Sequence, residues 1–341
     1  MLLVNYNINN NLINYIYCKM KILVTGGSGM VGMNIQYTQH CIDMMKDDEY
    51  VFISSQDCDL TNKARVDQFF EAGKFDRVIH LAARVGGLYK NMSANPEMLI
   101  HNMRMNMNVL EACHKYNINR AIFCLSSCVY PAEPSGFPMT ENMIDASPPH
   151  SSNEGYAYSK RMIKVLCDHY NKDFGREYIC LSPVNLYGPY DNYNLKNSHV
   201  IPGLIHRMSN FSEHKKRKPE SSYTFDVYGS GKALRQFLYA PDFARIILQI
   251  LNNEKVKGGL YNICDSDEYK ISEIIQMLQG YYRIPDKDIY YNTKYSDGII
   301  KKTVSNEKYR SLYPNFQFTD LKEGLRTATH WFHKNNKTCR K

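Results

Sequence analysis

The first half of the chain alternates short apolar runs with longer amphipathic stretches. Some runs have the length and flanking turn residues of buried strands, and they lie at residues 22–24, 50–54, 77–82, 121–126 and 177–183. The stretches between them space their apolar residues as a helix does, at about 30–45, 60–72, 97–116 and 156–174. Because strands alternate with helices, we predict βαβ units that form a parallel sheet with helices on both faces, a doubly wound α/β fold.

The pattern changes after Tyr187, where Gly188 and Pro189 interrupt it and a polar stretch rich in Asn and Lys runs to about residue 222. Beyond this stretch we predict helices at about 237–251, 271–280, 306–312 and 321–333. We expect this second half to form a smaller domain, partly interleaved with the first, over the carboxyl edge of the sheet. Open sheets of this kind bind their ligands at that edge.

The predicted domain boundaries follow from these patterns. Residues 1–19 are rich in Asn and make a poor signal peptide, so we expect a poorly ordered extension, with Met20 as an alternative first residue. Residues 20–190 form the doubly wound domain, and 226–250 packs on it. Residues 191–225 and 251–341 form the second domain, which we expect to bind the substrate.

Composition narrows the class of protein. A length of 341 residues suits two coupled domains, and 43% hydrophobic with 22% charged residues excludes fibrous and wholly disordered proteins. No run approaches the ~18 apolar residues of a membrane-spanning helix. The ten cysteines are scattered without a C-x-x-C pair, which indicates reduced thiols and a cytoplasmic protein. We expect no metal site.

The net charge of +8 suits an anionic small molecule as well as a nucleic acid. The basic run at residues 214–218 resembles a nuclear-localisation or nucleic-acid patch. Because it follows a polar stretch and precedes Pro219, we interpret it as a solvated loop. We therefore expect neither a nucleic-acid nor a membrane partner.

A glycine-rich turn follows the strand at 22–24 and opens the next helix. Gly26, Gly29 and Gly32 follow one another at steps of three. Glycine allows a tight turn and a close backbone approach, and the free N–H groups of a helix N-terminus bind a pyrophosphate. We predict a dinucleotide-binding loop formed by Gly26, Gly27, Ser28, Gly29, Met30, Val31 and Gly32.

Tyr156 and Lys160 lie four residues apart, on one face of a predicted helix. A tyrosine phenol has a pKa of about 10, and a neighbouring ammonium group lowers it and eases proton exchange with a carbonyl oxygen. Ser126 lies at the end of the preceding strand, where its hydroxyl can bind the same oxygen from the other side. These residues are candidates for a carbonyl-reducing site.

The order of Ser126, Tyr156 and Lys160 after the glycine turn resembles the extended short-chain dehydrogenase/reductase superfamily. Further segments resemble the GDP-L-fucose synthase family within that superfamily, and they lie at 84–87, 126–131, 183–192 and 197–202. They place Cys128 two residues after the serine and His199 in the loop that enters the second domain. The resemblance extends from about residue 21 to the end of the chain.

This resemblance implies a two-stage reaction on GDP-4-keto-6-deoxy-D-mannose. The C4 ketone acidifies the protons on C3 and C5, so Cys128 as base and His199 as acid can invert both centres. Tyr156 then gives a proton to the C4 oxygen during reduction, Lys160 tunes Tyr156, and Ser126 holds the oxygen. The product would be GDP-L-fucose.

The resemblance also implies which residues bind the ligands. The nucleotide-sugar would contact Arg207, Tyr228, Arg235, Asp297 and Lys302, of which Asp297 would meet the guanosine and Tyr228 stands where the family usually has Trp. Arginine suits a diphosphate because its planar group binds phosphate oxygens in pairs. Beyond the glycine turn, the cofactor would contact Ser54, Ser55, Leu125, Ser127, Lys160, Pro183, Val184, Asn185, Leu186 and His199.

The cofactor implied by the resemblance is NADP(H). Enzymes that use NADP commonly place an arginine near the adenosine ribose, but residues 54–56 contain no basic residue and Asp57 follows them. NADH therefore stays open as the alternative. By analogy with the superfamily, the helices at 97–116 and 156–174 would form a homodimer interface.

Two other classes of function remain as alternatives. One is another nucleotide-sugar enzyme of the superfamily, such as a 4-epimerase or a 4,6-dehydratase, although dehydratases typically carry Thr-Asp-Glu in place of Ser126, Ser127 and Cys128. The other is a binding protein on the same fold without catalytic activity. The presence of both Tyr156 and Lys160 argues against it.

Overall fold

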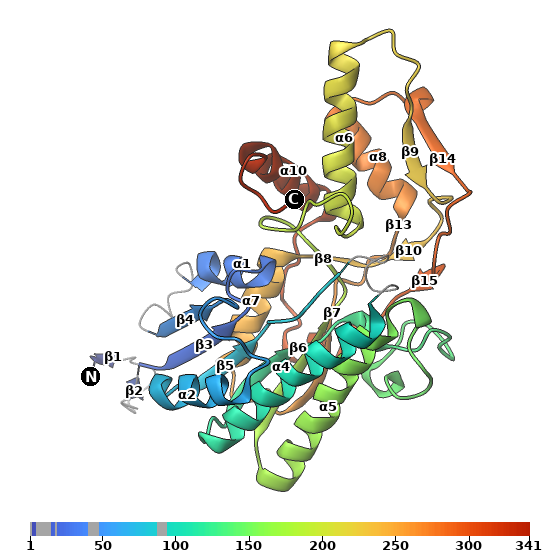
Figure 1. Cartoon of the computed structure of the whole chain (residues 1–341). Coiled ribbons are helices and arrows are strands. Elements are labelled where there is room, and N and C mark those ends of the chain that lie inside the picture. The colour runs from blue at the N-terminus through green and yellow to red at the C-terminus, as the bar shows by residue number, and fades with distance from the viewer. Residues whose placement is uncertain (1, 5–14, 18, 40–47, 87–93) are drawn as a thin grey trace.

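The computed structural model describes residues 2–4, 15–17, 19–39, 48–86 and 94–341 (Figure 1). Strands β1 (Leu2–Val4) and β2 (Tyr15–Tyr17) pair antiparallel in the extension before the first domain. The predicted lack of order in this extension falls mainly on residues 5–14, which lie outside the described residues. The end of the helix predicted at 30–45 also lies outside them.

A six-stranded sheet forms the centre of the first domain, with the order β12-β7-β6-β5-β3-β4 and every neighbouring pair parallel. Its strands are β3 (Lys21–Thr25), β4 (Glu49–Ile53), β5 (Arg77–His80), β6 (Arg120–Cys124), β7 (Glu177–Pro183) and β12 (Gly259–Ile263). Ile22, Leu23 and Val24 are fully buried because both faces of a parallel sheet are covered. The predicted doubly wound α/β fold is confirmed.

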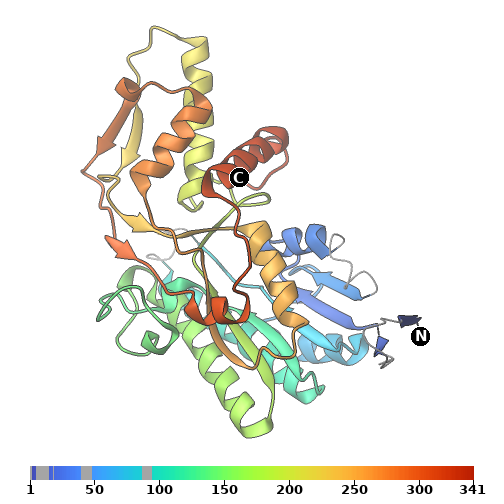
Figure 2. The same ribbon diagram turned by 180° about the vertical axis from the view of Figure 1, so that it is seen from behind.

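Helices cover both faces of this sheet. One face carries α2 (Lys63–Gly73), α4 (Asn95–Lys115) and α5 (Glu154–Phe174), which lie on the near side in Figure 1. The other face carries α1 (Met30–Gln39) and α7 (Ala240–Leu251), which pack together, and α7 lies in front in Figure 2. The chain reverses its direction across the sheet between β3 and β5, so the glycine turn after β3 lies at the switch point.

The segment predicted as one helix at 237–251 contains two elements. Residues Phe237–Tyr239 form β11, which pairs in parallel with β8 (Asn185–Tyr187), and the helix begins only at Ala240. The boundary between β11 and α7 could not be predicted from the apolar pattern, because three residues are too few to show the two-residue periodicity of a strand. Pro241 marks it, since proline favours the first turn of a helix.

The polar stretch after residue 191 contains a helix that the sequence pattern did not predict. Helix α6 (Val200–Arg217) buries Ile201, Leu204 and Ile205 against the second domain. The interpretation of the basic run at 214–218 as a loop is wrong for residues 214–217. These residues form the last turn of α6, where cations are stabilised by the helix dipole.

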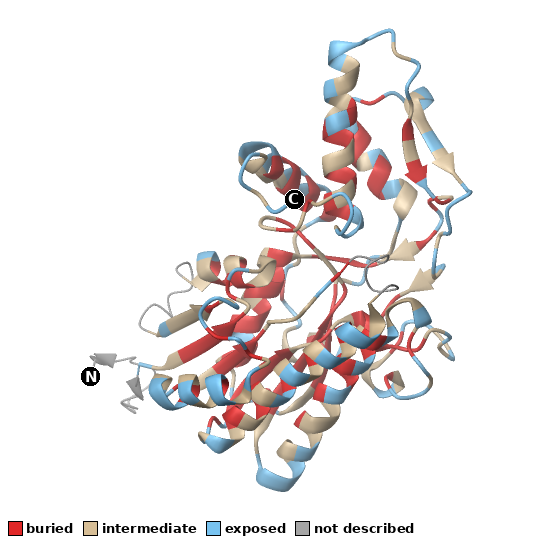
Figure 3. Ribbon diagram, in the orientation of Figure 1, coloured by how far each residue is buried: buried red, intermediate tan, exposed pale blue. Residues whose placement is uncertain are grey.

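The second domain has a core of its own between α6, α8 (Ile271–Tyr282) and α10 (Leu321–Asn335). Two parallel strands, β9 (Phe225–Tyr228) and β14 (Ile289–Asn292), flank these helices. The domain stands over the carboxyl edge of the large sheet, and buried residues of its helices face one another (Figure 3). A small sheet of β13 (Tyr269–Lys270), β10 (Leu234–Arg235) and β15 (Lys301–Lys302) lies between the two domains.

The first core extends into the last third of the chain. Strand β12 pairs with β7, and the short helix α9 (Glu307–Leu312) packs against β12. The same core therefore includes Leu260, Ile263 and Tyr309, which belong to the segment 251–341 that we assigned to the second domain. The short 3-10 helices are η2 (Ser127–Val129), η3 (Glu141–Met143), η4 (Ser151–Asn153) and η5 (Asp286–Asp288).

Across the described ranges, every helix is too short or too polar to pass through a lipid bilayer.

Candidate active site

The glycine turn between β3 and α1 is closely packed against its surroundings. Gly26 has a φ of +71°, which favours glycine, and a Cβ atom there would lie 2.8 Å from the backbone nitrogen of Ala82. A Cβ atom on Gly32 would lie 2.6 Å from the Gly26 oxygen. The turn can therefore bring backbone N–H groups close to a ligand at the N-terminus of α1, as the sequence predicts for Gly26 to Gly32.

The turn after β4 is built around Asp57. Its carboxylate accepts hydrogen bonds from the backbone N–H of Ser54 at 2.7 Å and from the Ser54 hydroxyl at 2.8 Å. These bonds hold the pKa of Asp57 below its usual value. One oxygen of the carboxylate, Oδ2, is thus engaged within the turn, while Ser54, Ser55 and Gln56 lie at the strand end where an adenosine ribose would lie.

The end of β6 leads directly into η2. The N–H of Leu125 donates to the Leu181 oxygen at 2.7 Å, which ties the strand end to β7. Ser126 then caps η2, because its hydroxyl oxygen accepts from the N–H of Cys128 at 3.4 Å. Ser127 and Cys128 are both buried in this short turn.

Lys160 is almost fully buried on α5, where it lies close to Tyr156. Its ammonium group donates a hydrogen bond to the Cys124 oxygen at 2.6 Å and lies 5.8 Å from the centre of the Tyr156 ring. Burial lowers the pKa of Lys160. The structure therefore brings the predicted pair together beside the end of β6.

The predicted lowering of the Tyr156 pKa is wrong for the free protein. Burial raises the pKa of Tyr156 well above its usual value, and the neighbouring thiols of Cys128 and Cys124 add to the effect. Desolvation disfavours the charged phenolate. Tyr156 is therefore a neutral hydroxyl in the free protein, which is the form that can give a proton.

The thiol of Cys128 shows the same competition between burial and charge. Burial raises its pKa, whereas Lys302, the Ser126 hydroxyl and Lys160 act in the opposite direction. The pKa is raised overall, so the lowered value that we expect for a thiol near a basic group is not observed. Cys128 nevertheless lies within electrostatic range of Tyr156, Lys160 and Lys302.

Two further cations, Arg235 and Lys302, lie side by side, and Lys302 acts electrostatically on Cys128. Strands β10 and β15 pair Arg235 with Lys302, and burial lowers the pKa of both groups. The Arg235 guanidinium donates to the Leu234 oxygen at 2.8 Å. Among the ion pairs of the described residues, neither Arg235 nor Lys302 has a carboxylate partner. Their charge is available for an anionic ligand.

Arg207 packs against the aromatic rings of Phe225 and Tyr228 in the second domain. Its guanidinium is 4.2 Å from the centre of the Tyr228 ring, and it donates to the Asp226 oxygen. The ring of Tyr295 lies 4.3 Å from that of Tyr228, and both tyrosines are exposed. Sequence reasoning did not identify Tyr295, because 67 residues separate it from Tyr228 and no motif marks it.

Asp297 holds the turn after Tyr228 in place. Its carboxylate accepts from the Ser230 N–H at 2.7 Å and from the Ser230 hydroxyl at 2.6 Å, which lowers its pKa. A contact of Asp297 with guanosine stays a prediction. In this structure the carboxylate positions the loop next to the Arg207 and Tyr228 pair.

His199 is the residue before α6, and it is exposed. The surrounding protein still displaces enough water to lower the pKa of its imidazole. The first turn of α6 lies above the carboxyl edge of the sheet (Figure 1). Within the described structure, no hydrogen bond joins the His199 ring to Cys128 or Tyr156, so the joint action of His199 with these residues stays a prediction.

The remaining predicted cofactor residues lie between the two domains. Pro183 ends β7, and the N–H of Val184 donates to the Ile263 oxygen at 3.2 Å. Asn185 and Leu186 belong to β8, and the Asn185 amide donates to the Gln236 oxygen at 2.9 Å. These residues thus belong to the segment that connects the large sheet to the second domain.

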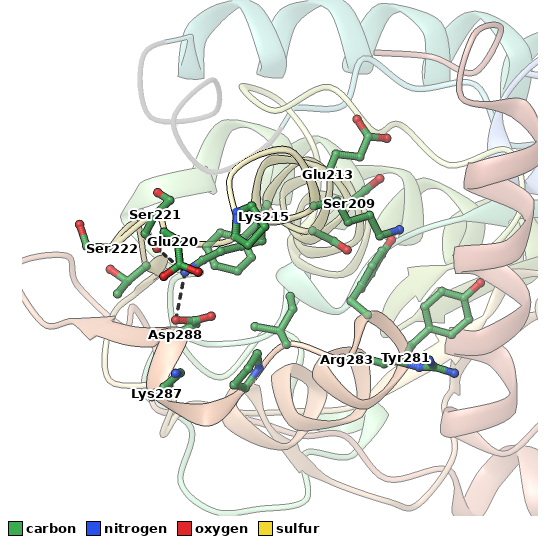
Figure 4. A pocket seen from close by; sticks show the side chains of 18 of the residues that line it. Ser209, Glu213, Lys215, Glu220, Ser221, Ser222, Tyr281, Arg283, Lys287 and Asp288 are labelled. Carbon is green, nitrogen blue, oxygen red and sulfur yellow. Dashed lines mark hydrogen bonds and ion pairs between the residues drawn. The ribbon is translucent and has the colours of Figure 1, made fainter.

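A separate hollow of about 1020 Å³ lies at the outer end of the second domain, between α6, α8 and the loop that follows α6 (Figure 4). Lys215 crosses it, donating to the Ser221 oxygen at 2.8 Å and to Asp288 at 3.2 Å. None of the predicted site residues lines this hollow.

The fold and this site define a class of protein. Residues 22–264 match the profile of the NAD dependent epimerase/dehydratase family. The match covers most of the chain and contains the glycine turn, Cys128, Tyr156, Lys160 and His199. The chain belongs to this family.

Relatives narrow the class to the GDP-L-fucose synthases. The GDP-L-fucose synthase of Dictyostelium discoideum is 40% identical over 324 residues, which cover 95% of this chain and 98% of the relative. The probable GDP-L-fucose synthase of Drosophila melanogaster is 39% identical over 322 residues, 94% and 99% of the two chains. A solved GDP-L-fucose synthetase from Naegleria fowleri bound to NADP matches with a TM-score of 0.85 and 35% identity over 96% of each chain.

Proposed function

We propose that this chain converts GDP-4-keto-6-deoxy-D-mannose to GDP-L-fucose, by epimerisation at C3 and C5 and reduction at C4 with NADPH. The observation that carries the proposal is the grouping of Cys128, Tyr156, Lys160 and Lys302 at one strand end, in a chain that is 40% identical to a GDP-L-fucose synthase. Reduction of a ketone by this type of site uses the serine, the tyrosine and the lysine and does not require a thiol. The thiol beside them adds a base for epimerisation.

Epimerisation requires a base and an acid on opposite faces of the sugar. The Cys128 thiolate takes the proton from C3 or C5, and the electrons of the broken C–H bond pass into the C4 carbonyl as an enolate. The His199 imidazolium returns a proton to the other face, which inverts the centre. Solvent then restores both groups by removing a proton from Cys128 and giving one to His199.

Reduction uses the same oxygen clamp. Ser126 and Tyr156 hold the C4 oxygen by hydrogen bonds, and NADPH supplies the hydride that adds to C4. Tyr156 gives its proton to the developing alkoxide, and the ammonium group of Lys160 stabilises the phenolate that remains. The raised pKa of Tyr156 in the free protein keeps this proton in place until the alkoxide forms.

The diphosphate and base of the substrate require cations and an aromatic surface. Lys302 and Arg235 are partly desolvated and lack carboxylate partners among the described ion pairs, so they suit phosphate oxygens. Tyr228 with Arg207 forms an exposed stacked pair that suits a purine. Tyr228 supplies this surface although the family usually has Trp at that position.

The residues present fit NADP(H). Gly26, Gly27 and Gly32 leave no room for a Cβ atom against the neighbouring backbone, so the turn stays tight and ends at the N-terminus of α1, where free N–H groups suit a pyrophosphate. Asp57 is partly engaged in its own turn, because its Oδ2 atom accepts two bonds from Ser54, and it is therefore less available to the ribose hydroxyls that an acidic residue binds in NAD enzymes. The Ser55 hydroxyl and the Gln56 amide remain as donors for a 2′-phosphate.

The chain acts as a homodimer in the cytoplasm. Helices α4 and α5 expose Ile100, Met107, Tyr158 and Met162, which supports an interface on this helix pair. The eight cysteines within the described residues are free thiols, which supports a reducing compartment.

Product analysis tests the proposed function. Purified protein incubated with GDP-4-keto-6-deoxy-D-mannose is expected to form GDP-L-fucose and to consume one NADPH for each product, with NADH less effective. Tyr156→Phe should lower the rate of NADPH oxidation by about 10²-fold to 10⁴-fold, the usual contribution of a general acid. Product formation without net NADPH consumption would identify a 4-epimerase or dehydratase instead.

A further inference from the structure

A series of hydrogen-bonded, buried polar groups connects the end of β3 with the second turn of α5. It consists of Thr25, His80, Asn106 and the backbone of Ser159, and all four residues are at most 2% exposed. The imidazole of His80 lies at its centre, with Nδ1 at 2.8 Å from the Thr25 hydroxyl and Nε2 at 3.1 Å from the Asn106 Oδ1 atom. The proposed reaction gives His80 no role.

The direction of each hydrogen bond follows from the chemistry of the partners. The Ser159 backbone oxygen can only accept, so the Asn106 amide nitrogen faces it, at 3.2 Å. The Asn106 oxygen therefore faces His80 and accepts, and the Nε2 atom of His80 must carry the proton. Nδ1 is then an acceptor for the Thr25 hydroxyl, whose oxygen in turn accepts from the Ala82 N–H at 3.3 Å.

His80 is neutral in this arrangement. Burial lowers its pKa to about 3, and the positive charge of Lys160 acts in the same direction. A neutral imidazole has one donor and one acceptor, and here both are used in a single orientation. Donor and acceptor are therefore fixed for every hydrogen bond in this series.

Both ends of this series lie at the proposed site. Thr25 is followed by Gly26, the first residue of the glycine turn. Ser159 lies between Tyr156 and Lys160 on α5, and its hydroxyl donates to the Tyr156 backbone oxygen at 2.6 Å. A displacement of the Ser159 oxygen would therefore move the turn of α5 that carries the proposed proton donor and its lysine.

We propose that His80, as the neutral tautomer with its proton on Nε2, is a positioning residue that holds the Tyr156–Lys160 turn of α5 in register with the glycine turn. The inference rests on the proposed function only in treating Tyr156 and Lys160 as the reducing pair. Its consequence is specific, because the loss of the Nε2 donor should lower hydride transfer and leave cofactor binding intact. A histidine that only fills the core would affect stability alone.

The tautomer is tested first, in the free protein and without any substrate. In ¹⁵N spectra of histidine-labelled protein, with His80 assigned by comparison with His80→Gln, its signals should show protonated Nε2 and unprotonated Nδ1 and should not titrate between pH 5 and 8. A titration near pH 6.5, or a proton on Nδ1, would overturn the inference. This result does not depend on which reaction the protein catalyses.

The positioning role is tested with a matched pair of variants. The amide nitrogen of glutamine can take the place of Nε2, so His80→Gln should keep the rate of single-turnover NADPH oxidation within about threefold of the parent. His80→Leu removes the donor and should lower that rate by about tenfold to a hundredfold, the loss that small misplacements cause. The Kd for NADPH should stay within about twofold in both variants.

Two results would contradict the positioning role. One is a melting temperature lowered by His80→Leu with unchanged hydride transfer in the folded protein, which would leave His80 a core residue only. The other is an equal loss of rate in His80→Gln and His80→Leu. If His80→Leu does not fold, Asn106→Leu breaks the same series at the next link and should show the same pattern. Failure of the parent protein to form GDP-L-fucose would instead contradict the proposed function.

Discussion

Cys128 and His199 have pKa values that are displaced in opposite directions. Burial raises the pKa of the thiol, and the loss of surrounding water lowers that of the imidazole, so both groups are neutral in the free protein near pH 7. Proton abstraction needs the thiolate and the imidazolium together. The thiolate–imidazolium pair holds the same number of protons as the thiol–imidazole pair. The small fraction of protein in this form is therefore constant at pH values between the two pKa values, and it decreases at lower and at higher pH.

Lys302 is expected to set the upper end of the pH range over which the fraction of the thiolate–imidazolium form is constant, because that end lies at the pKa of Cys128. Its positive charge favours the Cys128 thiolate, so Lys302→Met should raise the pKa of Cys128 further. At pH 8 the thiolate fraction, and with it the rate of alkylation of Cys128 by iodoacetamide, should fall several-fold. The rate is measured against pH by mass spectrometry of the peptide that contains Cys128.

Lys301 provides the control for this experiment. It is the neighbouring residue on β15, but its ammonium group pairs with Glu268 at 2.9 Å, and successive strand residues point to opposite sides. Lys301→Met should leave the alkylation midpoint of Cys128 unchanged. Equal midpoints for the Lys302 variant and the parent protein would show that the charge does not act on the thiol.

At the scale of elements, the junction of β3 and α1 depends on the absence of side chains. A Cβ atom on Gly32 would meet the Gly26 oxygen and the Gly27 Cα atom, each at 2.6 Å. Gly32→Ala should push α1 away from the turn and weaken NADPH binding by about tenfold or more, since overpacking commonly costs about 1–3 kcal/mol. NADPH fluorescence titration measures the change in Kd.

Gly280 on α8 is a matched glycine with free space around it. No atom lies within 4 Å of a Cβ built there, and it belongs to a helix interior. Gly280→Ala should leave the Kd for NADPH unchanged and stabilise the protein by about 0.5–1 kcal/mol. If Gly32→Ala binds NADPH as the parent does, the turn does not approach the cofactor as closely as proposed.

The elements that sequence patterns predicted best are those with a long helical or a clearly bounded strand pattern. Helices α4 and α5 agree with their predicted ranges to within a few residues. Strand β12 was not predicted, because its five residues become a sheet edge only by pairing with β7, which lies about 80 residues earlier in the chain. Helix α6 was not predicted, because polar residues surround its buried positions.

At the scale of the whole molecule, the helix pair α4 and α5 is the proposed contact between two subunits. Met162 lies on α5 with 40% of its surface exposed, beside other exposed apolar residues of the pair. Met162→Glu should place a charge in that contact and convert the dimer to a monomer. Light scattering after gel filtration should then give a mass of 39.6 kDa rather than twice that value.

Tyr290→Glu is the control, because Tyr290 is 52% exposed on β14 in the second domain, away from the helix pair. This variant should keep the dimer mass. A parent protein that elutes as a monomer would contradict the proposed interface, and a dimer that survives Met162→Glu would place the contact elsewhere.

The sequence by itself determined the type of fold and predicted the residues that we propose to carry the chemistry. Periodicity is a local property, so β3 to β7 and the helices between them can be read without knowledge of their neighbours. The glycine turn, Cys128, Tyr156, Lys160 and His199 are also local signals, because each belongs to a short motif.

Only the tertiary structure decided the environments of these residues. Whether a thiol or a phenol has a lowered or a raised pKa depends on the competition between burial and nearby charge, and burial dominates for both Cys128 and Tyr156. Lys302 acts electrostatically on Cys128, Asp297 is bound to Ser230, and His80 joins two turns, all between distant parts of the chain. Such contacts leave no trace in local sequence, because they arise from packing in three dimensions.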